Sequence, residues 1–118
     1  MQLVISRDLL LQAINLISKA ADKRHNMVIL GNMKLALTDS QLVMVASDLE
    51  LELQATLNLP ESACKQPGEI TVPANKFKDI VKLLPDGLPV SISVGDDNQC
   101  LIVCGSSRFK LSTLPAQD

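Results

Sequence analysis

Two segments with helical periodicity, each set among strand-like segments, limit what this chain can fold into. Residues 7–20 and 73–84 repeat apolar side chains at helical spacing, which is typical of amphipathic helices. One alternating run precedes each helix and three follow it, as short β-strands would. The expected strands span residues 2–6, 27–37, 41–47 and 49–59 in the first half, and 69–72, 89–94, 100–104 and 108–114 in the second.

The order β-α-β-β-β therefore occurs twice, in residues 1–59 and 69–114. A connection rich in proline and polar residues, 60–69, separates the two halves. Repeated units generally pack together to bury faces that neither can bury alone. We predict one α+β domain over residues 1–118, in which a duplicated unit brings two adjacent helices onto antiparallel sheets.

Each expected helix has a boundary signal and two distinct faces. Ser6 is placed to cap the first helix and Asp8 lies in its first turn, where a carboxylate favours the helix dipole. Pro73 suits the start of the second helix, and Leu84-Pro85-Asp86-Gly87 ends it. The apolar faces are Leu9, Leu10, Ala13, Ile14, Leu16, Ile17 and Ala20, then Phe77, Ile80, Val81 and Leu84. The polar faces are Asp8, Gln12, Asn15 and Lys19, then Asn75, Lys78, Asp79 and Lys82.

Composition argues against several classes of site. The chain has two Phe and neither Trp nor Tyr, so the core is aliphatic and aromatic platforms for single-stranded bases are scarce. The cysteines are odd in number, which favours reduced thiols: Cys64, Cys100 and Cys104. They form no CxxC motif and His25 is the only histidine, so we expect no metal site. The chain also lacks a long apolar run, so we expect a cytoplasmic protein without a membrane segment.

Net positive charge is concentrated in three segments of a chain whose overall net charge is −2. Residues 19–24, 73–84 and 105–113 each carry a local charge of +2, which leaves −8 for everything else. If the two helices lie side by side, five cations and three amides share one surface that suits phosphates. Ordinary solvated helix faces explain the same pattern equally well. These residues are Lys19, Lys23, Arg24, Lys78 and Lys82 with Gln12, Asn15 and Asn75.

The acidic residues Asp48, Glu50 and Glu52 project from one face of an expected strand. Alternation with leucine is also how a half-buried strand presents itself to water. Because no nucleophile, histidine or phosphate-binding glycine loop accompanies them, we expect no catalytic site and no cofactor.

Four motifs carry a resemblance to a known family. RHNMVILGN (24–32), ASDLELEL (46–53), EITVPANKFKDIVKLLP (69–85) and SSRFKLSTLPA (106–116) resemble the N-terminal third of the bacterial beta sliding clamps, the beta subunits of DNA polymerase III. The resemblance implies a non-catalytic processivity factor: a head-to-tail homodimeric ring around duplex DNA, with three such domains per subunit. It implies that the pocket for the replicative polymerase and the clamp loader lies in later domains.

The resemblance also assigns residues. Arg24 matches a DNA-contacting position, and Asn75 falls where a basic residue of a relative touches DNA. Phe109 and Leu111 match the subunit interface, with Lys76 and Arg108 as charge partners there. The alternation in 108–114 places Phe109 and Leu111 on one face of an edge strand, a pattern that core packing alone also explains. The alternative function is a generic α+β protein-interaction domain without DNA contact.

Overall fold

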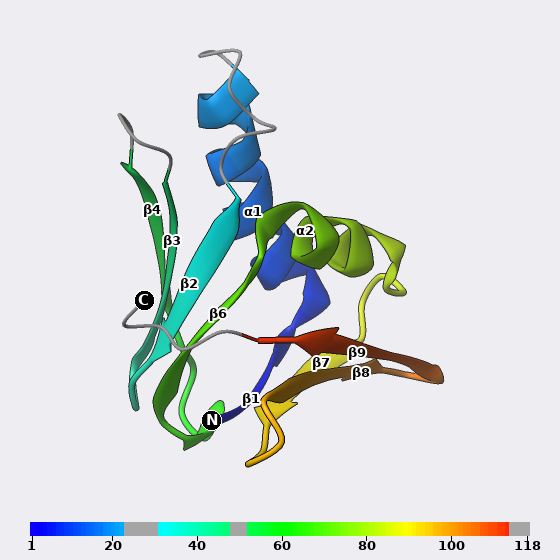
Figure 1. Ribbon diagram of the computed structural model, residues 1–118. Helices are drawn as coiled ribbons and strands as arrows, with labels where there is room; N and C mark the ends of the chain where they lie inside the picture. Colours follow the sequence, from blue (N-terminus) through cyan, green and yellow to red (C-terminus); the bar gives the residue numbers. More distant parts are fainter. Residues whose placement is uncertain (23–30, 48–51, 114–118) are drawn as a thin grey trace.

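Two antiparallel sheets set at an angle, with two helices in that angle, make up the fold (Figure 1). The computed structural model describes residues 1–22, 31–47 and 52–113. The elements in chain order are β1 (Gln2–Ser6), α1 (Arg7–Asp22), β2 (Asn32–Leu37), β3 (Gln41–Ser47), β4 (Glu52–Asn58), β5 (Cys64–Gln66), β6 (Gly68–Pro73), α2 (Ala74–Leu83), β7 (Pro89–Val94), β8 (Gln99–Cys104) and β9 (Ser107–Ser112). The prediction of two helices on antiparallel sheets is confirmed.

Each sheet combines strands from both halves of the chain. The five-stranded sheet has the order β5-β1-β7-β8-β9, and the four-stranded sheet has the order β4-β3-β2-β6. Strand β1 pairs with β7, with Leu3 opposite Ile92, while β6 pairs with β2, with Ile70 opposite Leu35. The strand before each helix therefore joins the sheet formed by the strands after the other helix, which ties the two halves into one core.

Helix α1 begins where the sequence predicts. The Ser6 hydroxyl accepts a hydrogen bond from the Leu9 backbone N–H at 3.4 Å, which satisfies one of the first N–H groups of the helix. The buried side of the helix consists of Leu10, Ala13, Ile14 and Ile17. The prediction is wrong for Leu16, which is 61% exposed because it follows Gln12 by one turn and so lies toward the outer face.

Helix α2 is shorter and more strongly two-sided. Pro73 is its N-cap residue, and Ala74, Phe77 and Val81 are buried along its inner side. The chain leaves the helix at Leu84, and Gly87 then adopts a φ of +74°, a conformation that favours glycine in the turn before β7. The predicted stop is confirmed.

Strands β2 and β5 depart most from the prediction, while the bounds of β6, β8 and β9 differ by one or two residues. Of the strand predicted over 27–37, the structure gives β2 from Asn32, directly after Gly31 with a φ of +61°. Residues 27–30 lie outside the described part of the chain. Strand β5, within the connection predicted to be a loop, was missed because its three residues show no alternation. Strands β2 and β3 are joined by a turn in which the Thr38 backbone N–H donates to the carbonyl oxygen of Gln41 at 2.9 Å.

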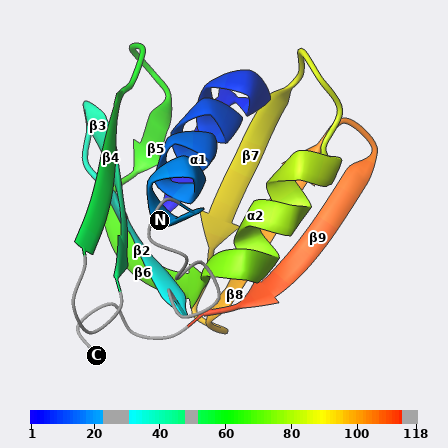
Figure 2. The ribbon, with the colours of Figure 1, turned by 90° about the horizontal axis from the view of Figure 1, so that it is seen from above.

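The two helices contact each other and run in opposite directions (Figure 2). Their inner sides meet the inner faces of both sheets in one aliphatic core that also contains the fully buried Phe77. Their outer sides face away from both sheets on the same surface of the molecule. In the parts of the chain that the structure describes, neither helix is long and apolar enough to cross a membrane.

Candidate nucleic-acid interface

The outer surface of the helix pair carries most of the described residues predicted to contact DNA. Gln12 and Asn15 of α1 are exposed, as are Asn75 and Lys82 of α2, and Lys78 is half-buried at the edge of that surface. The two helices contact each other and lie side by side between the sheets (Figure 2). The exposed residues of α1 and α2 therefore belong to neighbouring helix surfaces. The predicted juxtaposition of the two polar helix faces is therefore observed.

The lysines of α2 are available to an outside anion. Within residues 1–22, 31–47 and 52–113, the ion pairs involve Arg7 with Asp8, Arg7 with Asp86, and Lys34 with Glu69. The side chains of Lys76, Lys78 and Lys82 take part in none of these. Asp79, exposed on the same helix, reduces the net positive charge of this face.

Several predicted residues cannot be placed. Lys23 and Arg24 lie outside the described residues, and so does His25. Lys19 belongs to α1, but its side chain is likewise outside the description. Of the three carboxylates on the predicted acidic strand, Asp48 and Glu50 lie outside the described part, while Glu52 begins β4 and is exposed. Among the described residues, no group of three or more His, Cys, Asp or Glu side chains is placed to hold a metal ion.

The residues predicted for a subunit interface lie mostly on β9, which is an edge strand of its sheet as predicted. Phe109 is half-buried and Leu111 is 7% exposed, both on the side that faces the helices. Arg108 and Lys110 alternate with them and are exposed on the opposite side of the sheet. Lys76 is exposed on α2. Among the described strands, only β8 pairs with β9, so the other edge of β9 is open to a further strand.

The three cysteines are free thiols in the structure. Cys100 and Cys104 are buried on β8, Cys64 is half-buried, and all three are unpaired. Burial raises the pKa of the Cys100 thiol to about 11, so it stays protonated at neutral pH. Cys104 Sγ lies 3.9 Å from the carbonyl oxygen of Pro85.

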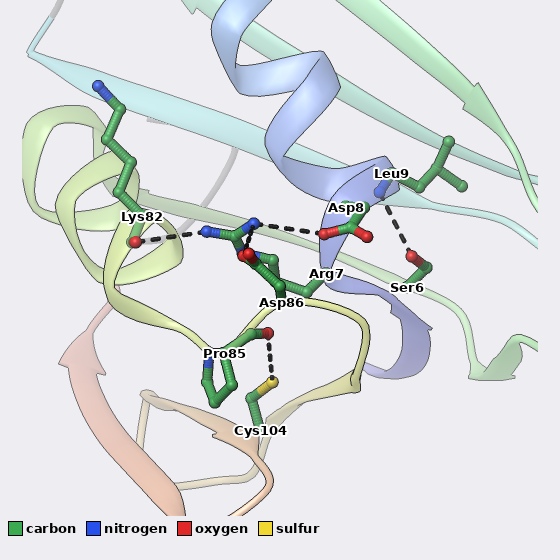
Figure 3. A network of polar contacts seen from close by, with 8 residues as sticks. All are labelled: Ser6, Arg7, Asp8, Leu9, Lys82, Pro85, Asp86 and Cys104. Atoms are coloured by element: carbon green, nitrogen blue, oxygen red, sulfur yellow. Dashed lines mark hydrogen bonds and ion pairs between the residues drawn. The ribbon is translucent and has the colours of Figure 1, made fainter.

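Two features of this surface were missed from the sequence. One is a groove of about 460 Å³ between α1 and β4, whose lining includes Leu16 and Leu53. The other is a group of polar contacts around Arg7 at the start of α1 (Figure 3). An arginine in the first turn, where the helix dipole disfavours a cation, is the sequence signal that points to the second.

A family model and curated relatives match the whole amino-acid sequence. The family model described as DNA polymerase III beta subunit, N-terminal domain, matches residues 1–118. The beta sliding clamp of Pseudomonas putida is 42% identical over 118 residues, and that of Escherichia coli is 37% identical. In both cases the alignment covers the whole chain and 31% of the relative.

Solved structures agree in fold. The DNA polymerase III subunit beta of Pseudomonas aeruginosa superposes with a TM-score of 0.85 at 41% identity, covering 100% of this chain and 31% of the other. A beta sliding clamp of Caulobacter crescentus also gives a TM-score of 0.85, at 38% identity and the same coverage. The chain thus belongs to the DNA polymerase III beta subunit family, the beta sliding clamps, and corresponds to their N-terminal domain.

Proposed function

We propose that this chain acts as the first of three domains of a ring-shaped sliding clamp, which encircles duplex DNA and keeps the replicative polymerase on its template. The chain spans 31% of the curated relatives that it matches, so the ring is an inference about a longer protein. The observation that carries the proposal is the shared outer face of α1 and α2, where exposed amides and lysines lie side by side. The chain itself has no catalytic part in replication.

The chemistry of that face suits sliding rather than specific recognition. Lysine amines contact phosphates as point charges, and amide side chains donate hydrogen bonds to phosphate oxygens without reading base edges. Asn75 contributes such an amide beside Lys78 and Lys82. The net charge of −2 keeps the attraction weak elsewhere on the molecule, which suits a protein that must move along DNA of any sequence.

Further residues enter the proposal through the family resemblance. Lys19, which belongs to α1, and Lys23 and Arg24, which follow the helix in the sequence, add positive charge to this surface, and Arg24 contacts phosphate. Phe109 and Leu111, with Lys76 and Arg108, join the neighbouring subunit of a head-to-tail homodimer. The polymerase and the clamp loader bind later domains, and the protein works in the cytoplasm.

A specific observation favours a second candidate, a protein-interaction domain without DNA contact. Leu16 is 61% exposed and Leu83 is 71% exposed, both toward the outer side of their helices. Apolar side chains gain nothing from phosphates but pack readily against a protein partner. The two candidates differ in whether the lysines of α2 respond to DNA.

Titration of the chain with a short duplex, followed by amide chemical shifts at several salt concentrations, separates them. We expect shifts on the outer faces of α1 and α2, with a dissociation constant no tighter than about 10⁻⁴–10⁻⁶ M. The slope of log K against log[salt] is negative, and replacing Lys78 and Lys82 together by glutamine should make it shallower by about 1.8. This is about 0.9 for each lost phosphate contact.

The matched control is the double change Lys34→Gln and Lys110→Gln, which removes the same charge from strands β2 and β9. It should leave the salt slope close to that of the unmodified chain. Equal losses in both double variants, or no shifts at low salt, would contradict the clamp proposal and favour the protein-interaction domain.

A further inference from the structure

Arg7 connects the start of α1 to the end of α2 (Figure 3). Its Nη1 lies 2.6 Å from an oxygen of Asp86 and 3.3 Å from one of Asp8, and its Nη2 donates to the carbonyl oxygen of Lys82 at 3.4 Å. Its backbone N–H donates to the carbonyl oxygen of Leu88 at 3.1 Å. The side chain is only 11% exposed. One residue therefore holds the last turn of α2 and the loop that follows it.

The dipole of α1 does not explain why an arginine lies at the start of this helix. A cation at a helix N-terminus is repelled by the dipole of its own helix, whereas a cation at a C-terminus is attracted. The guanidinium of Arg7 lies at both positions at once, at the start of α1 and against a carbonyl oxygen in the last turn of α2. The carbonyl of Lys82 is one of the four at the end of α2 that have no partner within the helix.

The burial of Arg7 also carries a cost. Its Nε is buried and has no hydrogen-bond partner among the described residues. The free-energy cost of this unsatisfied donor must be offset by the contacts of the two terminal nitrogens. The ion pair with Asp86 and the charge-assisted hydrogen bond to Asp8 provide that offset. The planar fork of arginine reaches a carboxylate and a carbonyl at the same time, which a lysine amine on a single stem cannot do with the same geometry.

We infer that Arg7 is a positioning residue, which fixes the last turn of α2, and with it Lys82, relative to the start of α1. The inference rests on the proposed function, because Lys82 matters only if the helix pair faces DNA. Figure 3 shows the amine of Lys82 pointing away from the guanidinium while its carbonyl accepts the bond. The charge of Arg7 is balanced by two carboxylates, so Arg7 orders the surface without itself contacting phosphate.

Amide hydrogen exchange of the chain tests the positioning role directly. In Arg7→Gln, we expect the amides of Leu83 and Leu84 to exchange about tenfold faster, because a hydrogen bond to a charged group is lost from that turn. The amide of Val81, one turn earlier, should change much less. Lys34→Gln removes the separate ion pair to Glu69 and serves as the control, with no change in α2.

Two results would overturn the inference. Equal acceleration of all slowly exchanging amides would mean that Arg7 adds only to global stability, and unchanged exchange at Leu83 and Leu84 would mean that it holds nothing. Full recovery of amide protection in Arg7→Lys would show that a positive charge at position 7 is enough to hold the last turn of α2. It would overturn the role given to the planar guanidinium. Asp86→Asn should reproduce most of the Arg7→Gln effect, since it removes the shortest contact.

DNA titration gives the second readout and separates the two proposals. In Arg7→Gln, the DNA-induced shift of Lys82 should fall by about half, because a frayed last turn of α2 no longer holds that lysine in one place, while the shift of Asn75 at the other end of α2 stays. If the unmodified chain shows no DNA-induced shifts, the proposed function fails. The exchange measurement still decides the contacts of Arg7 in that case.

Discussion

Replacing Phe77 by alanine tests which side of α2 faces the core. Phe77 is fully buried on the inner side of the helix, beside Val81. Truncation of a buried phenylalanine to alanine costs about 3–5 kcal/mol, because the lost apolar transfer and the remaining cavity add. In a domain of this size, 1 kcal/mol lowers Tm by about 4 °C, so we expect Phe77→Ala to melt about 12–20 °C below the unmodified chain.

The control is Leu83→Ala, a truncation on the same helix at a side chain that is 71% exposed. It should change the free energy of unfolding by less than about 0.5 kcal/mol, as surface substitutions do. Thermal melts followed by far-UV circular dichroism, with urea titrations to check that the m-value is unchanged, give both numbers. Equal losses in the two variants would refute the orientation of α2 and with it the outward placement of Lys82.

Three further predictions concern other parts of the molecule. Ser6→Ala should lower stability by about 1 kcal/mol in urea titrations because it removes the cap of α1, and an unchanged midpoint would contradict that cap. Burial raises the pKa of Cys100 from 9.0 to about 11, so with rising pH the thiol ionises in the unfolded chain before it does in the folded one. The free energy of unfolding should therefore be unaffected by this group below pH 9 and fall by about 2–3 kcal/mol as the pH rises to 11. A Cys100→Val variant should lack that fall, and an identical fall in both would rule out this cause. Phe109→Asp should leave the chain folded, because Phe109 is only half-buried on the edge strand β9, yet it should give a monomer when the full-length protein is sedimented. An intact ring would contradict its interface role.

The elements of the fold were predictable because each depends on short-range patterns. The alternation of residues 89–94 predicts a strand that the structure gives as β7, Pro89–Val94. The cap at Ser6 and the stop at Leu84 follow from local chemistry in the same way. Periodicity was less reliable for Leu16, because a helix shows a wide arc of apolar residues while the neighbouring sheets cover only part of it.

The arrangement of the elements was predictable only in part. Nothing near β1 in the sequence indicates that it pairs with β7 rather than with a strand of its own half. The contact between Arg7 and the carbonyl of Lys82 joins residues 75 positions apart, so no local pattern reveals it. The candidate site shows the same division: composition identifies the lysines and amides of the helices, whereas only the packing of α1 against α2 places them on one surface.

The central claim is that the outer faces of α1 and α2 together form the DNA-facing surface. Paramagnetic relaxation from a duplex with a spin-labelled backbone, measured on the chain at low salt, tests it most directly. We expect the amides of Asn15, Asn75 and Lys82 to broaden, and those of Lys34 and Lys110, on strands of the two sheets, to stay sharp. Equal broadening at all these lysines, or broadening confined to the sheets, would contradict the account.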